Sequence, residues 1–448
     1  MRKYLLLVIV LSLTLSACNL APAYQRPPMA IPEGWSVSRA APQPQQQETA
    51  PFWQALENVE LARLMQIALA QNLDLQAALH RIEQARAQAK VAGAGLLPSL
   101  DAGGGLSQTY QERRDDSRVD GFITLSYELD LWGRNRSQAE AATYRVEASQ
   151  YDREALRLVV TTDTAVLFTR VLGFNDRIRI AENNLKNAEE ILRIVEARFR
   201  EGSVSALEVS QQKVVVNNIR SALTTLIEQQ ATTLNALAVL LGQAPQRFGA
   251  PQAELASLNI PTVNLTPPAS LLTGRPDIQS AEAGLLAANA DIGAARAAFF
   301  PSLQLGADGS LIAAGFGDPA TTALSLAANV LAPIFSGGRL EGNLETVTAR
   351  QRELAAQYQR TVLTAFQEVE NALASLKSTA QQIALARESV QAAQNAYNIA
   401  KARFGAGSID YLTLLETQRS LSQVEDEQVV ATVAQLEAFV QLRKALGS

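Results

Sequence analysis

Residues 122–132 read FITLSYELDLW, and their side chains alternate between apolar and polar. The apolar positions are Ile123, Leu125, Tyr127, Leu129 and Leu131, and the polar positions between them are Thr124, Ser126, Glu128 and Asp130. Successive side chains of a β-strand point to opposite faces. The pattern therefore predicts a strand with one apolar and one polar face.

Three further segments predict strands. Residues 99–111 alternate less regularly, and the charged segment QERRDDSRVDG at 111–121 predicts a loop between the first two strands. Later in the chain, two segments again place apolar and polar residues on opposite faces. In the first segment the apolar residues are Leu303, Leu305 and Leu311, and the polar residues are Ser302, Gln304, Asp308 and Ser310. In the second segment the apolar residues are Leu324, Leu326 and Val330, and the polar residues are Ser325 and Asn329. The sequence thus predicts four strands in two hairpins.

Each predicted hairpin is followed by a long helical pattern without proline. Asn135 to Glu201 and Arg339 to Phe404 are each more than 60 residues long, which corresponds to roughly 100 Å of helix. Gly173 predicts a bend or interruption in the first of these helices. The turn residues Gly202, Ser203, Gly407 and Ser408 predict two hairpin tips, each followed by a returning helix.

The chain repeats itself at a spacing of about 205 residues. NLDLQAALHRIEQARAQAKVAGAGLLPSL from residue 72 matches RPDIQSAEAGLLAANADIGAARAAFFPSL from residue 275, and ARFREGSVSALEVSQQ from residue 197 matches ARFGAGSIDYLTLLETQ from residue 402. The period is far longer than that of a solenoid repeat, so it indicates a duplicated domain-sized unit.

The predicted organisation places the boundaries in Pro-rich segments and turns. A signal peptide occupies 1–17, a lipidated arm 18–58, the first repeat 59–242, a Pro-rich linker between the repeats 243–275 and the second repeat 276–448. In the first repeat a helix precedes a hairpin at 98–132, a long helix, a tip at 202–205 and a return helix. In the second repeat the hairpin lies at 301–335 and the tip at 405–409.

The N-terminus has the layout of a secretory signal. Arg2 and Lys3 precede an apolar run that ends near Ser16 and Ala17, directly before Cys18, the chain's single cysteine. Leu15 to Cys18 is similar to a bacterial lipoprotein box, which implies that Cys18 becomes the acylated N-terminus of the mature chain and carries lipids such as palmitate. Asn19 permits sorting to the outer membrane. The alternative is a chance thiol in a discarded segment.

Composition argues against several classes of protein. A net charge of −5 gives no basic surface for nucleic acid. His80 is the only histidine, which leaves no multi-histidine metal site and makes a Ser-His-Asp triad improbable. We therefore expect no enzyme activity and no cofactor or metal.

The predicted strands suit an outer-membrane barrel. Four strands cannot close a barrel, and an open sheet edge is not tolerated in lipid. Two chains would give eight strands with a filled interior, and three would give twelve strands around a lumen. The alternatives are a soluble β-sandwich, a membrane-anchored coiled-coil scaffold without a channel, and a periplasmic enzyme.

The stretches RPDIQSAEAGLLAANADIGAARAAFFPSL, ELDLWGR and APIFSGGRLEGNLE resemble outer-membrane efflux proteins of the TolC type, in the lipoprotein branch typified by OprM. The resemblance implies a mixed α and β, mostly helical fold. In this fold, three chains together form a twelve-stranded barrel, which is continued by a helical tunnel through the periplasm. It also implies the exit duct of a tripartite, multidrug-type efflux system. The implied partners are a periplasmic adaptor and an inner-membrane pump, most often of the resistance-nodulation-division class.

The resemblance further implies a gate beyond the second tip, in GSIDYLTLLETQRSL. Leu412 and Glu416 match positions that point inward as rings, and Arg419 can pair with Glu416 within a chain or between chains. Many relatives carry Asp at the position of Glu416. The alternative is that Leu412 packs between helices and Glu416 forms a solvated pair with Arg419. Asp410 is expected to cap the helix rather than to act in the gate.

Overall fold

The structure, a computed structural model, describes residues 20–36, 51–111, 114–261, 263, 265–315 and 318–447. The predicted leader at 1–17 and the predicted lipidation site, Cys18, lie outside the described residues. The described residues form two compact units. The first unit draws on 1–29, 78–152 and 277–361, and the second on 30–77, 153–276 and 362–448.

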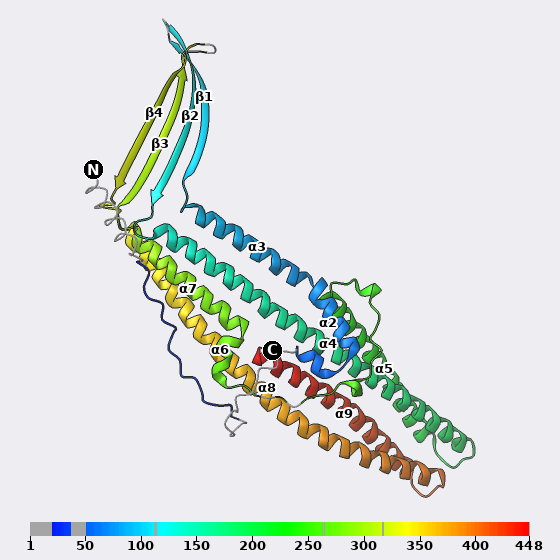
Figure 1. Ribbon diagram of the computed structural model, residues 1–448. Coiled ribbons are helices and arrows are strands. Elements are labelled where there is room, and N and C mark those ends of the chain that lie inside the picture. Colours follow the sequence, from blue (N-terminus) through cyan, green and yellow to red (C-terminus); the bar gives the residue numbers. More distant parts are fainter. Residues whose placement is uncertain are drawn as a thin grey trace. The chain divides into compact units, whose positions relative to one another are not determined.

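The described part of the chain is mostly helical and contains four strands, as predicted. Figure 1 shows their arrangement. The strands are β1 Ser99–Gln111, β2 Arg114–Leu129, β3 Ser302–Ala313 and β4 Thr321–Leu331. The α-helices are α2 Val59–Gln71, α3 Leu73–Ala94, α4 Arg134–Arg200, α5 Ala206–Leu240, α6 Leu271–Gly274, α7 Pro276–Ala297, α8 Arg339–Gly405 and α9 Tyr411–Leu446. Short 3-10 helices are η1 Phe52–Leu56, η2 Pro245–Arg247, η3 Leu255–Ser257 and η4 Pro268–Ser270. Among the described helices, none is long and apolar enough to cross a membrane.

The four strands of the first unit form one antiparallel sheet in the order β1-β2-β3-β4 (Figure 1). The pairing of β1 with β2 extends to Gln111 and Arg114. The predicted loop at 111–121 is therefore wrong, because β2 already begins at Arg114. Charged residues do not exclude a strand here, because β1 pairs with β2 along this whole stretch.

Helices α4 and α8 each contain 67 residues. The interruption that Gly173 predicts does not occur, because α4 is continuous from Arg134 to Arg200. A side chain at Gly173 would place its Cβ 2.5 Å from Cγ2 of Val433 in α9. This glycine therefore permits close packing of α9 against α4, which the sequence of α4 alone does not reveal.

The helix predicted before the first hairpin is divided in two at Asn72. Asn72 has an extended backbone conformation, and its side chain accepts a hydrogen bond from the Leu75 N–H at 2.9 Å. Its amide nitrogen donates to the Leu240 carbonyl at 2.8 Å. Asn72 thus caps α3 and joins it to the end of α5.

Two apolar clusters hold the second unit together. The first packs α2 against α4, α5 and α9, and includes Phe52, Leu64, Met65, Phe168, Leu237 and Phe439. The second lies close to the helical tips and includes Ile191, Val195, Val215, Tyr397, Phe404, Tyr411 and Leu414.

Candidate functional site

The two faces of the sheet differ in chemistry across all four strands. Pairing partners lie on the same face, so one row can be followed from edge to edge. One such row consists of Asp101, Thr124, Asp308 and Ser325. The adjacent row on the opposite face consists of Leu100, Leu125, Ala307 and Leu326. The alternation predicted for single strands therefore produces a continuous polar face and a continuous apolar face.

The polar face is bridged by side chains. Thr124 donates to Asp308 at 2.8 Å, and the hydroxyls of Ser99 and Ser126 lie 2.8 Å apart. Phe122 is an exception that the sequence analysis did not explain, since this aromatic residue lies on the polar face. Its ring covers Gly103 on β1, and a Cβ at Gly103 would lie 2.5 Å from the ring. The aromatic residue shields the backbone of its glycine neighbour.

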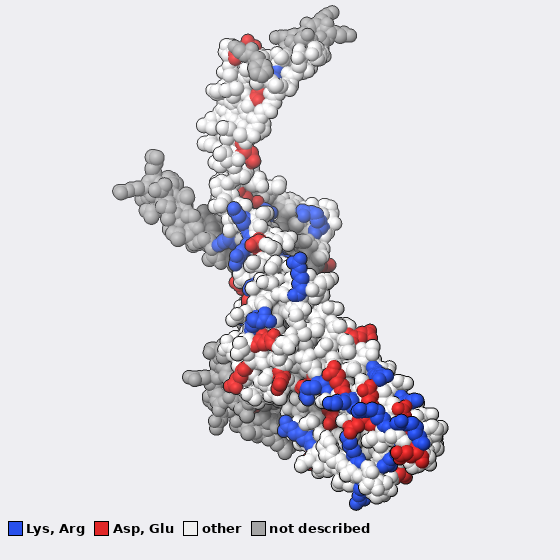
Figure 2. All heavy atoms as spheres, turned by 90° about the vertical axis from the view of Figure 1, so that its right-hand side faces the viewer, with Lys and Arg blue, Asp and Glu red and all other residues white. Residues whose placement is uncertain are grey.

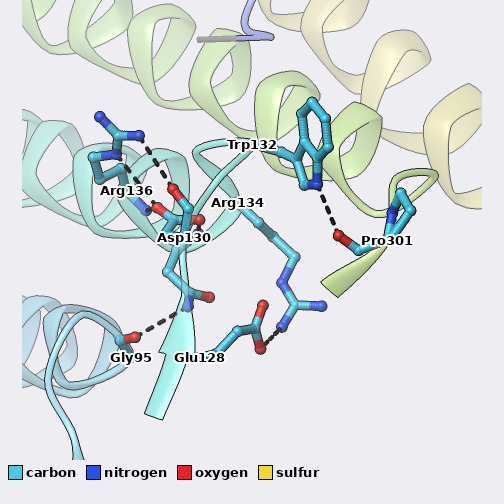
Figure 3. A network of polar contacts seen from close by, with 8 residues as sticks. Gly95, Glu128, Asp130, Trp132, Arg134, Arg136 and Pro301 are labelled. Atoms are coloured by element: carbon cyan, nitrogen blue, oxygen red, sulfur yellow. Dashed lines mark hydrogen bonds and ion pairs between the residues drawn. The ribbon is translucent and has the colours of Figure 1, made fainter. Parts of the chain in front are cut away.

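Asp130 links β2 to α4 (Figure 3). Its carboxylate accepts hydrogen bonds from the backbone N–H groups of Asn135 at 3.0 Å and Arg136 at 2.8 Å. These N–H groups belong to the first turn of a helix, where they have no partner within the helix. A carboxylate there also complements the helix dipole. Asp130 therefore fixes where α4 begins after the strand.

Trp132 connects the same junction to the second hairpin (Figure 3). Its indole N–H donates to the Pro301 carbonyl at 2.7 Å, and its ring stacks on Phe300 with centroids 4.7 Å apart. Close by, Arg134 forms an ion pair with Glu128 at 2.6 Å. The ELDLWGR segment thus joins the end of β2 to the start of β3.

The two helical tips have the same backbone geometry. Gly202 and Gly407 have φ angles of 74° and 75°, which favour glycine. The N–H of Ser203 donates to the Arg198 carbonyl at 2.9 Å. In the second tip, the N–H of Ser408 donates to the Arg403 carbonyl at the same distance. In both tips the serine hydroxyl donates to that carbonyl at 3.0 Å. The glycine N–H donates to the carbonyl three residues before it, at 3.0 Å in both tips. The two backbone bonds of each tip form a Schellman motif, which ends a helix.

The returning helices begin with caps. Ser205 forms a capping box with Glu208 at the start of α5. Asp410 accepts a hydrogen bond from the Thr413 N–H at 2.8 Å, so it is the N-cap of α9 as predicted. The side-chain and backbone hydrogen bonds of Thr413 lower the pKa of Asp410. Both tips are therefore stabilised on both sides of the turn.

The predicted gate residues lie near the start of α9. Leu412 is 58% exposed, whereas Leu414 and Leu415 are buried. Within the single chain, the Leu412 side chain is therefore not packed between helices. Glu416 and Arg419 are exposed. Among the ion pairs of the described residues, none joins Glu416 to Arg419.

Three contacts that the sequence analysis missed join the first helical hairpin to the second. The guanidinium of Arg198 donates to the Phe404 carbonyl at 2.7 Å and lies over the Phe404 ring, 4.4 Å from its centroid. Lys401 pairs with Glu190 at 2.9 Å, and the Tyr411 hydroxyl donates to Gln212 at 2.6 Å. These partners are about 200 residues apart in sequence, so no local pattern could have revealed them.

Charged side chains are unevenly distributed over the surface. Figure 2 shows few of them along most of the strands, whereas Lys and Arg alternate with Asp and Glu over the ends of the helical hairpins. In the described part of the chain, no group of three or more His, Cys, Asp or Glu residues is placed to hold a metal ion.

Comparison with known families decides the assignment. The family model described as outer membrane efflux protein matches residues 64–243 and 268–448. The chain belongs to this family. One matched range contains the segment from residue 72 and the other contains the similar segment from residue 275, and together they span most of the chain.

Individual relatives agree with the family. The chain is 38% identical to the pyoverdine export outer membrane protein OpmQ of Pseudomonas aeruginosa, over 97% of this chain and 94% of that protein. It is 32% identical to the toluene efflux pump outer membrane protein TtgC of Pseudomonas putida, over 100% and 96%. The structure is similar to that of the Neisseria gonorrhoeae MtrE outer membrane channel in its open state, with a TM-score of 0.85 and 26% identity, over 96% and 98%. The protein is an outer-membrane efflux channel.

Proposed function

We propose that three copies of the chain assemble into the exit duct of a tripartite efflux system. The observation that supports this most directly is the sheet, which has a polar face, an apolar face and two unpaired edges at β1 and β4. In lipid, an unpaired edge leaves backbone N–H and C=O groups without partners. Pairing of β4 with β1 of the next copy closes a barrel of twelve strands around a lumen, with the apolar face toward lipid.

Membership of the family supports a proposal for the partners and the cargo. A periplasmic adaptor and an inner-membrane pump, most often of the resistance-nodulation-division class, complete the system. The duct carries small organic molecules such as drugs and itself performs no chemical step. Relatives named for pyoverdine export and toluene efflux support small organic cargo.

We propose that Leu412, Glu416 and Arg419 form the periplasmic gate. Leu412 and Glu416 are four residues apart on α9, so they share a helix face. Three copies of Leu412 form a dewetted constriction, and three copies of Glu416 form a ring that attracts cations. Exposure of both side chains in the single chain supports this role, because it leaves them free to face the same residues of neighbouring copies.

The arm that follows Cys18 supports a lipid anchor near the strands. The Arg26 guanidinium binds both carboxylate oxygens of Glu282 in α7, at 2.9 and 2.7 Å. Asn289 donates to the Pro22 carbonyl at 2.7 Å, and Arg296 donates to the Leu20 carbonyl at 3.3 Å. Arg296 lies in the last turn of α7, shortly before β3 begins. The described arm therefore bonds the helix that leads into β3, which supports an anchor on the arm.

Replacement of Cys18 by serine, with a conventional signal peptide, should remove the anchor but not the duct. The strands supply the membrane-spanning surface, so trimers should still form while the yield in the outer membrane falls. Several acyl chains contribute roughly 0.8 kcal/mol per buried methylene to membrane binding. Mass spectrometry of the wild-type membrane fraction should find acylated Cys18, and an unmodified thiol there would disprove the lipid claim.

The function is tested with the purified wild-type protein. In detergent it should run as a heat-resistant trimer, and in a planar bilayer it should conduct ions. A dimer without conductance would support the alternative of a membrane-anchored scaffold.

A further inference from the structure

Gln212 is a polar side chain in an apolar environment. It lies on α5 with 0% exposure, among the buried residues of the cluster near the tips. A buried amide is costly unless its oxygen and nitrogen both find partners. Its presence there needs a structural reason.

Both ends of the amide are satisfied, and the partners lie on two other helices. The Gln212 nitrogen donates to the Ala188 carbonyl of α4 at 2.8 Å, and the Tyr411 hydroxyl of α9 donates to the Gln212 oxygen at 2.6 Å. One side chain of α5 therefore connects α4 with the first residue of α9. Burial raises the pKa of Tyr411 to about 12, while Arg419 acts in the opposite direction. The hydroxyl thus remains a proton donor at physiological pH.

Tyr411 directly precedes Leu412, the first of the proposed gate residues. Consecutive side chains of an α-helix are turned by about 100°. Tyr411 is only 4% exposed whereas Leu412 is 58% exposed. If the Tyr411 side chain is held inside the cluster, the direction in which the Leu412 side chain points away from α9 is also fixed.

We propose that Gln212 is a positioning residue for the gate, which holds the first turn of α9 through Tyr411 and thereby sets the orientation of Leu412. This role rests on the proposed function of the duct. Apolar packing alone is non-directional and tolerates rotation or sliding of a helix. A fully satisfied buried hydrogen-bond network specifies one arrangement.

The internal repeat shows that this connection is particular to the second hairpin. With Gly202 aligned to Gly407, the position of Tyr411 is occupied by Ala206 in the first repeat, and the position of Gln212 by Thr417 in the second. Thr417 donates to the Leu414 carbonyl of its own helix at 2.8 Å. The connection is therefore not a general requirement of the hairpin, and it lies on the helix that carries the gate.

The test uses substitutions that keep the packing. Gln212→Met retains an unbranched side chain but removes the amide, and Tyr411→Phe removes only the hydroxyl. Each should raise the fraction of time that single trimers spend open by about tenfold, which corresponds to about 1.4 kcal/mol. Trimer yield and heat resistance should stay at the wild-type level. The double variant should leak no more than the leakier single variant, because both remove the same hydrogen bond.

Gln229→Met is the matched control, since it removes an exposed amide from the same helix. It should conduct like the wild type. If Gln212→Met and Tyr411→Phe trimers are stable and also conduct like the wild type, Gln212 has no positioning role. If the two substitutions increase the open fraction additively in the double variant, they do not act through the same hydrogen bond, which would also refute the proposal. Absence of conductance in the wild type would instead refute the proposed duct, so the two failures are distinguishable.

Discussion

Arginine at Leu125 should abolish assembly in the outer membrane, whereas arginine at the next residue, Ser126, should be tolerated. The two positions lie on opposite faces of β2, with Leu125 in the apolar row beside Leu100 and Ala307. A cation on the lipid face near the bilayer midplane costs about 2 to 4 kcal/mol. A trimer would bear this cost three times. At Ser126 the charge would project into a hydrated lumen.

The measurement is the amount of heat-resistant trimer in purified outer membranes. Leu129→Arg tests a second position on the same face and should also reduce the amount. Ser126→Arg should assemble and shift the ion selectivity of the pore toward anions, because three positive charges would line the lumen. Equal tolerance of arginine at Leu125 and Ser126 would contradict the assignment of the two faces.

Removing the proposed gate side chains should open the duct. The double variant Leu412→Ala and Glu416→Ala shortens both exposed side chains on the gate face of α9. Without the three leucine side chains, the constriction becomes wider and fills with water. Without the three carboxylates, it no longer attracts cations. Single-channel conductance should rise severalfold, and cells should become sensitive to large antibiotics.

The effect on folding should be small, since neither side chain is buried in the single chain. Trimer yield is therefore the internal control for the double variant. Asp410→Asn supplies a second control, because it changes the cap of α9 but keeps an acceptor for the Thr413 N–H. Well-folded double-variant trimers with wild-type conductance would place the gate elsewhere.

Much of the fold could be read locally. The alternation at 122–132 predicts the strand, because side-chain direction in a strand has a period of two. The glycine-serine pairs predict the tips, because a left-handed residue at a helix end favours glycine. Asp410 predicts a cap, because the first N–H groups of a helix need an acceptor.

Other features were misjudged because their causes lie on distant segments. Most residues from Arg114 to Gly121 are charged, yet β1 pairs with them and they belong to the sheet. Gly173 suggests a break, yet it makes room for Val433 some 260 residues later. Asn72 divides the first helix because it bonds the end of α5.

Most strands, the helical tips and the chemistry of each strand face could be read from the sequence, because they depend on neighbours within a few residues. The duplication could be read as well, because two segments about 205 residues apart are similar. The register that aligns Asp101 with Thr124 and Asp308, and the link from Gln212 to Tyr411, depend on the folded chain. A hydrogen bond between residues 199 positions apart depends on how whole helices pack, and no local period encodes that arrangement.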